Sequence, residues 1–221
     1  MRWVEQPIYF IDFECSLASG ILEYGVVTVL GGRVVATQTR LCRAAGPVRP
    51  EDAAVHGLRE EELASYAPFA DEWDYFAALR ELGPLAAHYA GVENSLLKAV
   101  WPYPRLSPDF ARPGEKVAEW GPWVDTARLM AQVSPRLPSG RLENLVADCG
   151  LQAELDGFAV AHCLPDRRRY HAAHFDALAG ACLLTRLAAE PEVADKSTRW
   201  LLAMSTLDPE KRDALQQTRL F

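Results

Sequence analysis

PIYFIDFE, residues 7–14, is a short apolar run rich in β-branched and aromatic residues, as expected of a buried strand. Two similar runs follow, LEYGVVTVL at 22–30 and RVVATQTRLC at 33–42. The Gly31–Gly32 pair between them is typical of a tight hairpin turn. The chain is therefore expected to open with three consecutive strands, the last two forming a hairpin.

Helical and strand patterns alternate in the rest of the chain. Two proline-containing segments interrupt them, a loop at 46–58 and an irregular excursion at 102–122. The expected short strands are 84–90 and 121–126, and the expected helices are 68–82, 92–101, 140–149, 172–189 and a region around 197–204. This order favours an α/β architecture, in which a mixed sheet carries helices on its faces.

Length and composition fit one domain with appendages, because 221 residues at 49% hydrophobic content can bury a sizeable core. The 23 basic and 30 acidic residues give a formal charge of −7. This charge argues against a protein that holds nucleic acid by bulk electrostatics, since phosphate contacts supply non-specific affinity. It leaves open an enzyme that grips a short strand end and uses acidic residues to bind divalent metal.

The cysteine pattern and the start of the chain bear on its location. The cysteines form no CxxC pair, and their odd number without a signal pattern fits free thiols in a reducing compartment; they are Cys15, Cys42, Cys149, Cys163 and Cys182. No apolar run approaches the roughly 20 residues that span a bilayer. We expect a soluble, cytoplasmic protein without a membrane partner.

Asp12 and Glu14 interrupt the first apolar run. Residues two apart in a strand project from the same face, and burying two like charges together is costly unless a cation compensates. The pair therefore indicates a metal site. The alternative is an edge strand whose polar face meets solvent, and a short D-x-E pattern does not distinguish the two.

His171 and Asp176 stand where an arginine run ends and a helical pattern begins, in HAAHFDA. A helix would separate these two residues by about 140° around its axis. We therefore place His171 just before the helix and Asp176 in its first turns, from where both reach one cavity. The alternative for His171 is a helix cap or a solvated loop histidine.

The ordered motifs resemble those of the DnaQ-like, or DEDDh, exonucleases, which include proofreading subunits, RNase T and oligoribonuclease. The tyrosine of the sister subclass would stand at Ala172, so the histidine subclass fits better. The resemblance covers roughly residues 7–190. It comprises FIDFE (10–14), ILEYGVV (21–27), a stretch from Pro50 ending in HGL at Leu58, HYAGVE (88–93) in place of H-N-A-x-F-D, WVDT (123–126), LENLVADCGL (142–151) and the third motif from His171 to Ala177.

The resemblance implies an RNase H-like fold with a mixed five-stranded sheet and helices on both faces, spanning residues 1–190, followed by a helical tail at 191–221. It also implies two divalent ions about 4 Å apart, Mg²⁺ or Mn²⁺, because hard oxygen ligands select against zinc. Asp12 would bridge the ions, and His171 would take a proton from the attacking water. Glu14 and Asp176 would complete the first site, and Glu93 would support the second.

Glu93 departs from the pattern, because the family has aspartate at this position. The extra methylene moves the carboxylate by more than about 1 Å, and octahedral Mg²⁺ tolerates misplacement poorly. A ligand acting through water would have more freedom. We expect an active enzyme, and Glu93 could alter its preference between divalent metal ions relative to the family.

Substrate contacts are expected within and next to the motifs that carry the resemblance. His88 is equally well explained as a structural histidine, and Arg167–Arg168–Arg169 either contact phosphates or form a solvated loop. The aromatic and basic side chains of 102–122 either bind a single strand or anchor the loop by packing. The full set of expected substrate contacts is Phe13, Cys15, His56, Gly57, His88, Arg167, Arg168 and Arg169.

The last five residues, QTRLF (217–221), resemble the Q-x-x-L-F peptide by which bacterial replication and repair proteins bind the sliding clamp. Gln217, Leu220 and Phe221 would carry this contact. Alternatively the tail folds back and buries its apolar side chains on its own domain.

The leading hypothesis is a 3′→5′ exonuclease that acts on single-stranded ends, with DNA and a role in repair as the first expectation. It would release nucleoside monophosphates. The alternatives are an RNA-processing exoribonuclease and a weakened domain that only binds nucleic acid or a partner. The sequence leaves the oligomeric state open.

Overall fold

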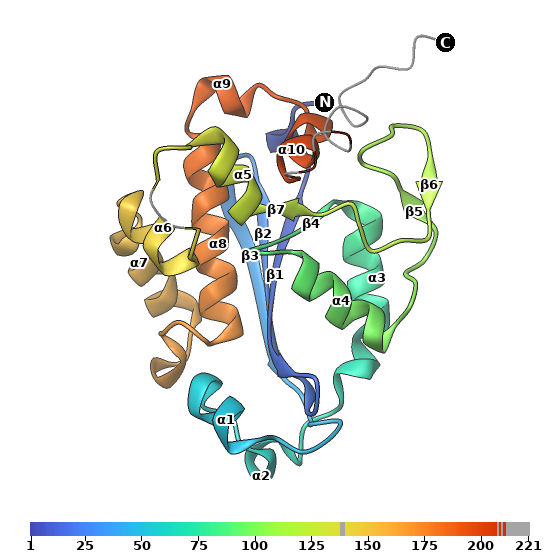
Figure 1. Cartoon of the computed structure of the whole chain (residues 1–221), viewed down its shortest axis with the longest axis vertical. Coiled ribbons are helices and arrows are strands. Elements are labelled where there is room, and N and C mark those ends of the chain that lie inside the picture. Colours follow the sequence, from blue (N-terminus) through green and yellow to red (C-terminus); the bar gives the residue numbers. More distant parts are fainter. Residues whose placement is uncertain (138–139, 207, 209, 211–221) are drawn as a thin grey trace.

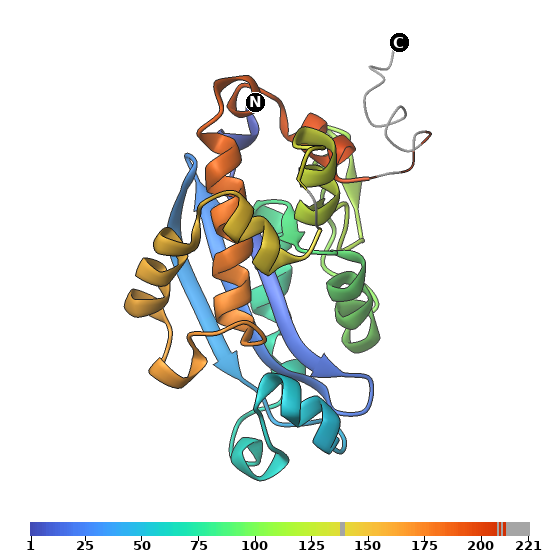
Figure 2. The same ribbon diagram turned by 60° about the vertical axis from the view of Figure 1, so that its left-hand side comes forward.

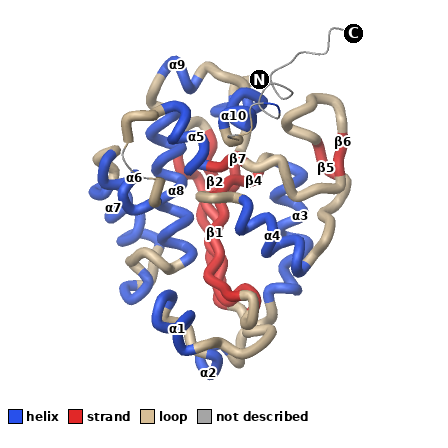
Figure 3. Tube along the Cα trace, in the orientation of Figure 1, coloured by secondary structure: helices blue, strands red, loops and turns tan. Residues whose placement is uncertain are grey.

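A five-stranded mixed sheet forms the centre of the computed structural model, which describes residues 1–137, 140–206, 208 and 210. Its strand order is β3-β2-β1-β4-β7, and the strands lie together in the middle of the molecule (Figures 1 and 3). β1 pairs antiparallel with β2 and parallel with β4, β2 pairs antiparallel with β3, and β4 pairs parallel with β7. The expected mixed five-stranded α/β fold is confirmed. The strands are β1 (Ile8–Ser16), β2 (Gly20–Leu30), β3 (Arg33–Leu41), β4 (Leu85–Ala87) and β7 (Val124–Asp125).

Helices cover both faces of this sheet. α8 runs along one face with α6 and α7 outside it, while α3 and α4 lie on the other (Figures 1 and 2). The α-helices are α1 (Pro50–His56), α2 (Glu60–Leu63), α3 (Trp73–Leu82), α4 (Gly91–Val100), α5 (Thr126–Val133), α6 (Leu142–Asp148), α7 (Gln152–His162), α8 (Ala173–Ala188), α9 (Pro191–Ala194) and α10 (Thr198–Met204). Short 3₁₀ turns are Trp3–Glu5, Phe69–Glu72 and Pro165–Arg167.

Three expectations about local structure were wrong or incomplete. The segment 46–58 is not only a loop, because α1 begins at Pro50 and ends at His56, with Gly57 as its C-cap at φ 78°. Proline suits the first position of a helix and glycine its end, so these residues mark boundaries instead of disrupting the helix. The excursion at 102–122 contains a small hairpin of β5 (Ser107–Pro108) and β6 (Lys116–Val117), and α5 and α7 were not anticipated.

Alternation along β1 divides the core into two layers. Ile8 and Phe10 pack with α8 in one hydrophobic cluster, whereas Ile11 and Phe13 pack with Phe76 of α3 in the other. This alternation follows from the two-residue period of a strand. Asp12 and Glu14 share the parity of Phe10, so they belong to the face that α8 covers.

Glycines allow α8 to approach the sheet closely. A Cβ at Gly180 of α8 would lie 1.9 Å from the ring of Phe10, and one at Gly25 of β2 would lie 2.4 Å from the carbonyl oxygen of Ala173. Both distances are far below a van der Waals contact, so side chains at these positions are excluded. The first turn of α8 is thereby held directly over β1 and β2.

Residues after 190 pack onto the same core. Leu201 and Leu202 of α10 are buried in the cluster that contains α8, and Trp3 donates a hydrogen bond from Nε1 to the carbonyl of Val193 at 2.8 Å. The boundary at residue 190 stays a prediction, and residues 217–221 lie outside the described part of the chain. Within the described residues, no helix has both the length and the apolar character that crossing a bilayer requires.

Candidate active site

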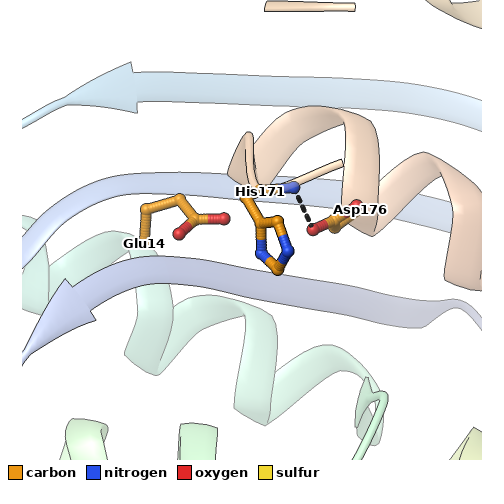
Figure 4. Close-up of side chains that lie close together, drawn as sticks. All are labelled: Glu14, His171 and Asp176. Atoms are coloured by element: carbon orange, nitrogen blue, oxygen red, sulfur yellow. Dashed lines mark hydrogen bonds between the residues drawn. The ribbon is translucent and has the colours of Figure 1, made fainter. Parts of the chain in front are cut away.

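Three side chains from two elements meet at the end of β1. One ligand atom from each of Glu14, His171 and Asp176 lies within 4.8 Å of the other two (Figure 4). Glu14 belongs to β1, Asp176 to the first turn of α8, and His171 to the segment before that helix. The packing of α8 on the sheet thus brings together Glu14 of the first motif and His171 and Asp176 of the third.

His171 has an unusual backbone conformation. Its φ is 60°, and its N–H donates to Oδ2 of Asp176 at 3.0 Å. α8 begins two residues later, so the predicted placement of His171 before the helix and Asp176 in its first turn is confirmed. Oδ1 of Asp176 is buried and has no hydrogen-bond partner among the described residues.

A break in strand register occurs at the same point. Glu14 is paired with Glu23 of β2, but Cys15 is paired with Ile21, so the register shifts between Glu14 and Cys15. Such irregularities bend a strand and redirect its side chains, and they often occur beside active sites. The direction of Glu14 therefore depends on this break as well as on strand alternation.

The carboxylates repel one another in a buried position. Burial raises the pKa of Asp12 well above its usual value, and the charges of Asp176, Glu93 and Glu14 raise it further. Burial and then the charge of Asp176 raise the pKa of Glu14 to about 8. Burial likewise raises the pKa of Asp176 to about 7. These shifts mean that the cluster stabilises its protonated form unless positive charge is supplied.

Glu93 reaches the cluster from the opposite side of β1. It occupies the first turn of α4, is buried, and its Oε2 has no partner among the described residues. Burial raises the pKa of Glu93 to about 8, with a further contribution from the charge of Asp125. Glu93 is outside the group of ligand atoms within 4.8 Å, yet its charge acts on Asp12.

The donor set fits a hard divalent cation. It consists of carboxylate oxygens and one imidazole, and two buried carboxylate oxygens, on Glu93 and Asp176, lack partners among the described residues. A cation would supply the missing partners and offset the repulsion that raises the pKa values. Mg²⁺ and Mn²⁺ favour such oxygen ligands.

Glu23 is a functional candidate that the sequence reasoning missed. It is 4% exposed, lies opposite Glu14, and pairs with the guanidinium of Arg167. Its Oε2 also accepts from the N–H of Ala173 at 3.1 Å, so it caps the start of α8. The available signal was its place opposite Glu14 across the β1–β2 pair, because residues opposite each other on paired strands share a face.

The three arginines before His171 bind backbone carbonyls of the protein. Nη1 of Arg167 donates to the carbonyl of His56 at 2.6 Å, and Nη2 of Arg169 donates to the same oxygen at 3.1 Å. Arg168 donates from Nε to the carbonyl of Cys163 at 3.2 Å. Arg167 and Arg169 therefore connect the end of α1 to the segment before α8, whereas Arg168 bonds to the end of α7, and contact with phosphates stays a prediction.

Gly57 and His56 lie within this connection. A Cβ at Gly57 would be 2.5 Å from Nη2 of Arg169, so the arginine side chain occupies the space beside this expected substrate contact. His56 is buried, and its Nδ1 accepts from the N–H of Leu58 at 3.1 Å. Burial lowers the pKa of His56.

The remaining predicted substrate contacts, His88, Cys15 and Phe13, lie at different places relative to the carboxylates. The nitrogens of His88 bond to Oγ1 of Thr126 at 3.0 Å and to the carbonyl of Gly140 at 2.7 Å, which supports the structural alternative for this histidine. Cys15 is half-buried, and its thiol pKa is raised by burial and by the charge of Glu14. Phe13 packs on the other face of β1, so its side chain is not brought to the carboxylates.

Three solved structures similar to this chain are exonucleases. An exonuclease X bound to 5′-overhanging duplex DNA is similar over 90% of this chain and 99% of its own, with 20% identity and a TM-score of 0.64. The nuclease domain of 3′hExo, a DEDDh family member bound to rAMP, covers 85% of this chain and 94% of its own, with 14% identity and a TM-score of 0.60. E. coli exonuclease I with a dT13 oligonucleotide covers 83% of this chain at 13% identity and a TM-score of 0.61.

These likenesses establish the fold of the chain. The match spans only 41% of the length of E. coli exonuclease I, so that protein contains much that this chain does not match. No protein-family model and no curated protein sequence matches the chain.

Proposed function

We propose that the protein is a metal-dependent 3′→5′ exonuclease that hydrolyses phosphodiester bonds at single-stranded ends and releases nucleoside monophosphates. The observation that carries this proposal is the meeting of Glu14, His171 and Asp176 at the end of β1, beside half-buried Asp12. Buried carboxylates beside an exposed histidine match the needs of metal-assisted phosphodiester hydrolysis. The fold shared with several exonucleases supports the same reaction.

Asp12, Glu14, Glu93 and Asp176 would hold two Mg²⁺ or Mn²⁺ ions. When bound, such ions stabilise the negative charge that develops on the phosphate and its leaving oxygen. An imidazole nitrogen of His171 would accept the proton of the attacking water. The hydrogen bond from His171 N–H to Asp176 fixes the backbone of this base, and the Glu23–Arg167 pair supports the segment before it.

DNA is the proposed substrate, and RNA is the competing one. E. coli exonuclease I was solved with a dT13 oligonucleotide, and a 3′-exonuclease of this fold recognises the 3′ end of a histone mRNA stem-loop, so proteins of this fold bind either type of nucleic acid. Matched DNA and RNA strands of one sequence, each labelled at the 5′ end, would separate the two. Faster shortening of the DNA strand is expected.

A second candidate function is a binding module without activity. The observation that favours it is Glu93, whose longer side chain stands where the resemblance implies aspartate. The deciding experiment incubates the protein with a 5′-labelled single strand and Mn²⁺, beside an Asp12→Ala variant. The enzyme proposal predicts 3′ shortening that the variant loses, and it fails if the two proteins behave identically.

Two further parts of the proposal concern partners and location. We propose that Gln217, Leu220 and Phe221 bind a sliding clamp and that the protein acts in the cytoplasm during DNA repair. A pull-down with purified clamp would compare the full chain with a variant lacking 217–221. Equal capture of both would contradict the clamp proposal.

A further inference from the structure

A cavity of about 380 Å³ opens directly beside the candidate active site. Its volume is in the range of cavities that bind small molecules. Two of its lining residues, His171 and Asp176, belong to the proposed catalytic group. The complete lining is Tyr89, Arg141, Leu142, Glu143, Tyr170, His171 and Asp176.

Both backbone outliers of the described chain line this cavity. Tyr89 with φ 61° and His171 with φ 60° are the non-glycine residues with positive φ among the residues that the structure describes. A bulky residue in this conformation is strained, and such strain concentrates at functional sites. His171 has a proposed role, so the strain at Tyr89 calls for a separate explanation.

Burial does not explain the conformation of Tyr89. The residue is 42% exposed, with its ring at 4.9 Å and nearly perpendicular to the ring of His88. The guanidinium of Arg128 lies 5.8 Å from the Tyr89 ring centre. An exposed aromatic ring beside a cation is the combination with which proteins bind single-stranded nucleic acid.

Tyr170 supplies a polar group on the cavity wall. Its ring contacts Phe175 edge-on at 5.1 Å, which fixes its position at the start of α8. Its hydroxyl oxygen is buried and has no hydrogen-bond partner among the described residues. Buried hydroxyl groups are normally satisfied, so a ligand group in the cavity would complete this one.

We propose that this cavity binds one nucleoside of the substrate strand next to the scissile phosphate. Tyr89 is the surface on which its base stacks, and the hydroxyl of Tyr170 hydrogen-bonds to it. This assignment rests on the proposed exonuclease function and adds a base-binding subsite to it. Stacking on an aromatic ring tolerates every base, so the subsite requires a base without selecting its sequence.

The test uses strands that lack one base, at the 3′-terminal or at the neighbouring position. Wild-type protein is expected to shorten one of these abasic strands about ten-fold more slowly than the intact strand, a size typical of losing one stacked base. Tyr89→Asn removes the ring, while asparagine accepts positive φ. This variant should shorten the intact strand about ten-fold more slowly than wild type and should no longer distinguish the intact from the abasic strand.

Tyr66→Asn is the matched control, because Tyr66 is also an exposed tyrosine but lies outside the cavity. It should leave the preference for the intact strand unchanged. Tyr170→Phe should weaken cleavage of the intact strand about three-fold, the loss of one modest hydrogen bond. Thermal unfolding should show that Tyr89→Asn is at least as stable as wild type.

A binding measurement separates this inference from the proposed reaction. Fluorescence anisotropy with Ca²⁺ in place of Mn²⁺ reports the Kd of intact and abasic strands without requiring cleavage. If wild type shows no cleavage but Tyr89→Asn loses base-dependent binding, the exonuclease proposal fails and the subsite stands. If Tyr89→Asn retains the wild-type preference for an intact strand in both assays, the subsite is overturned.

Discussion

The two sides of the carboxylate cluster are built with different rigidity. On the α8 side, Asp176 sits on a helix pressed against the sheet at Gly25 and Gly180, and Glu23 caps that helix. On the α4 side, Asp125 likewise accepts from a helix-start N–H, that of Ala90 at 3.1 Å, and Leu97 is fully buried in the second core cluster. Glycines bring α8 into backbone contact with the sheet, whereas α4 is held through side chains, so a small shift of α4 meets less steric resistance.

This difference coincides with the departure of Glu93 from the expected carboxylate set. Asp12, Glu14, His171 and Asp176 carry the residue types that the resemblance implies, and they lie on the rigid side. Glu93 carries the longer acid and lies on the side with fewer constraints. A helix that can shift slightly accommodates an extra methylene, whereas one in van der Waals contact with a strand does not.

The largest effect is expected on the rigid side. Asp176→Asn keeps an oxygen that can accept from the N–H of His171 but removes the charge. Because metal ions contribute several kcal/mol of charge stabilisation, we expect kcat/KM to fall about 1000-fold. Single-turnover cleavage of a labelled strand in Mn²⁺ would measure it. A loss below about ten-fold would remove Asp176 from the metal site.

The close packing of α8 gives a prediction about stability. Gly180→Ala forces a methyl group against Phe10, so we expect the free energy of unfolding to fall by about 1–3 kcal/mol. Gly157→Ala in α7 is the matched control, since a Cβ there meets nothing within 4 Å. This control should gain about 0.5–1 kcal/mol. Urea denaturation would compare them, and equal effects would refute the contrast in packing.

A smaller effect is expected on the α4 side. Glu93→Gln should lower kcat/KM about ten-fold, because a ligand that acts through water contributes less than a direct one. Glu93→Asp should change the ratio of Mg²⁺-supported to Mn²⁺-supported activity, since Mg²⁺ is the stricter in geometry. Steady-state assays in each metal would show it. A 1000-fold loss of kcat/KM in Glu93→Gln would contradict the expectation that the α4 side contributes less to catalysis than the α8 side.

The smallest effect concerns pH. The folded pKa is about 8 for Glu14 and Glu93, above the usual value of 4.5, so the folded state binds more protons than the unfolded one between these limits. Without metal, stability should therefore fall as pH rises through this window. Metal reverses the repulsion, so added Mg²⁺ should raise Tm by about 3 °C more at pH 8 than at pH 5.5. Thermal scans would test this, and the double variant Glu14→Gln, Glu93→Gln should flatten the difference.

Much of the fold was predictable because its signals are local. The apolar runs and the Gly31–Gly32 turn defined β1, β2 and β3, and helical periodicity defined α8. α1 was missed because Pro50 was interpreted as a break, although proline is favoured in the first turn of a helix. The short strands β4 and β7 were expected within 84–90 and 121–126, but no local pattern encodes their parallel pairing.

Only those residues of the candidate site that belong to recognisable sequence motifs could be predicted. Asp12, Glu14, His171 and Asp176 could be named because their types and spacing matched a known order. Glu23 required knowledge of which residues face each other across the hairpin, and the cavity at Tyr89 required the tertiary fold. Contacts between residues far apart in the sequence follow from tertiary packing and produce no local sequence pattern.

The hydrogen bond from His171 N–H to Asp176 has a consequence for how the chain can vary. It closes the backbone from 171 to 176 into a ring, with the proposed base at one end and a proposed metal ligand at the other. Inserting or deleting a single residue inside this ring would displace both groups at once. The residues between His171 and Asp176 can therefore be substituted, but their number cannot change without loss of the site.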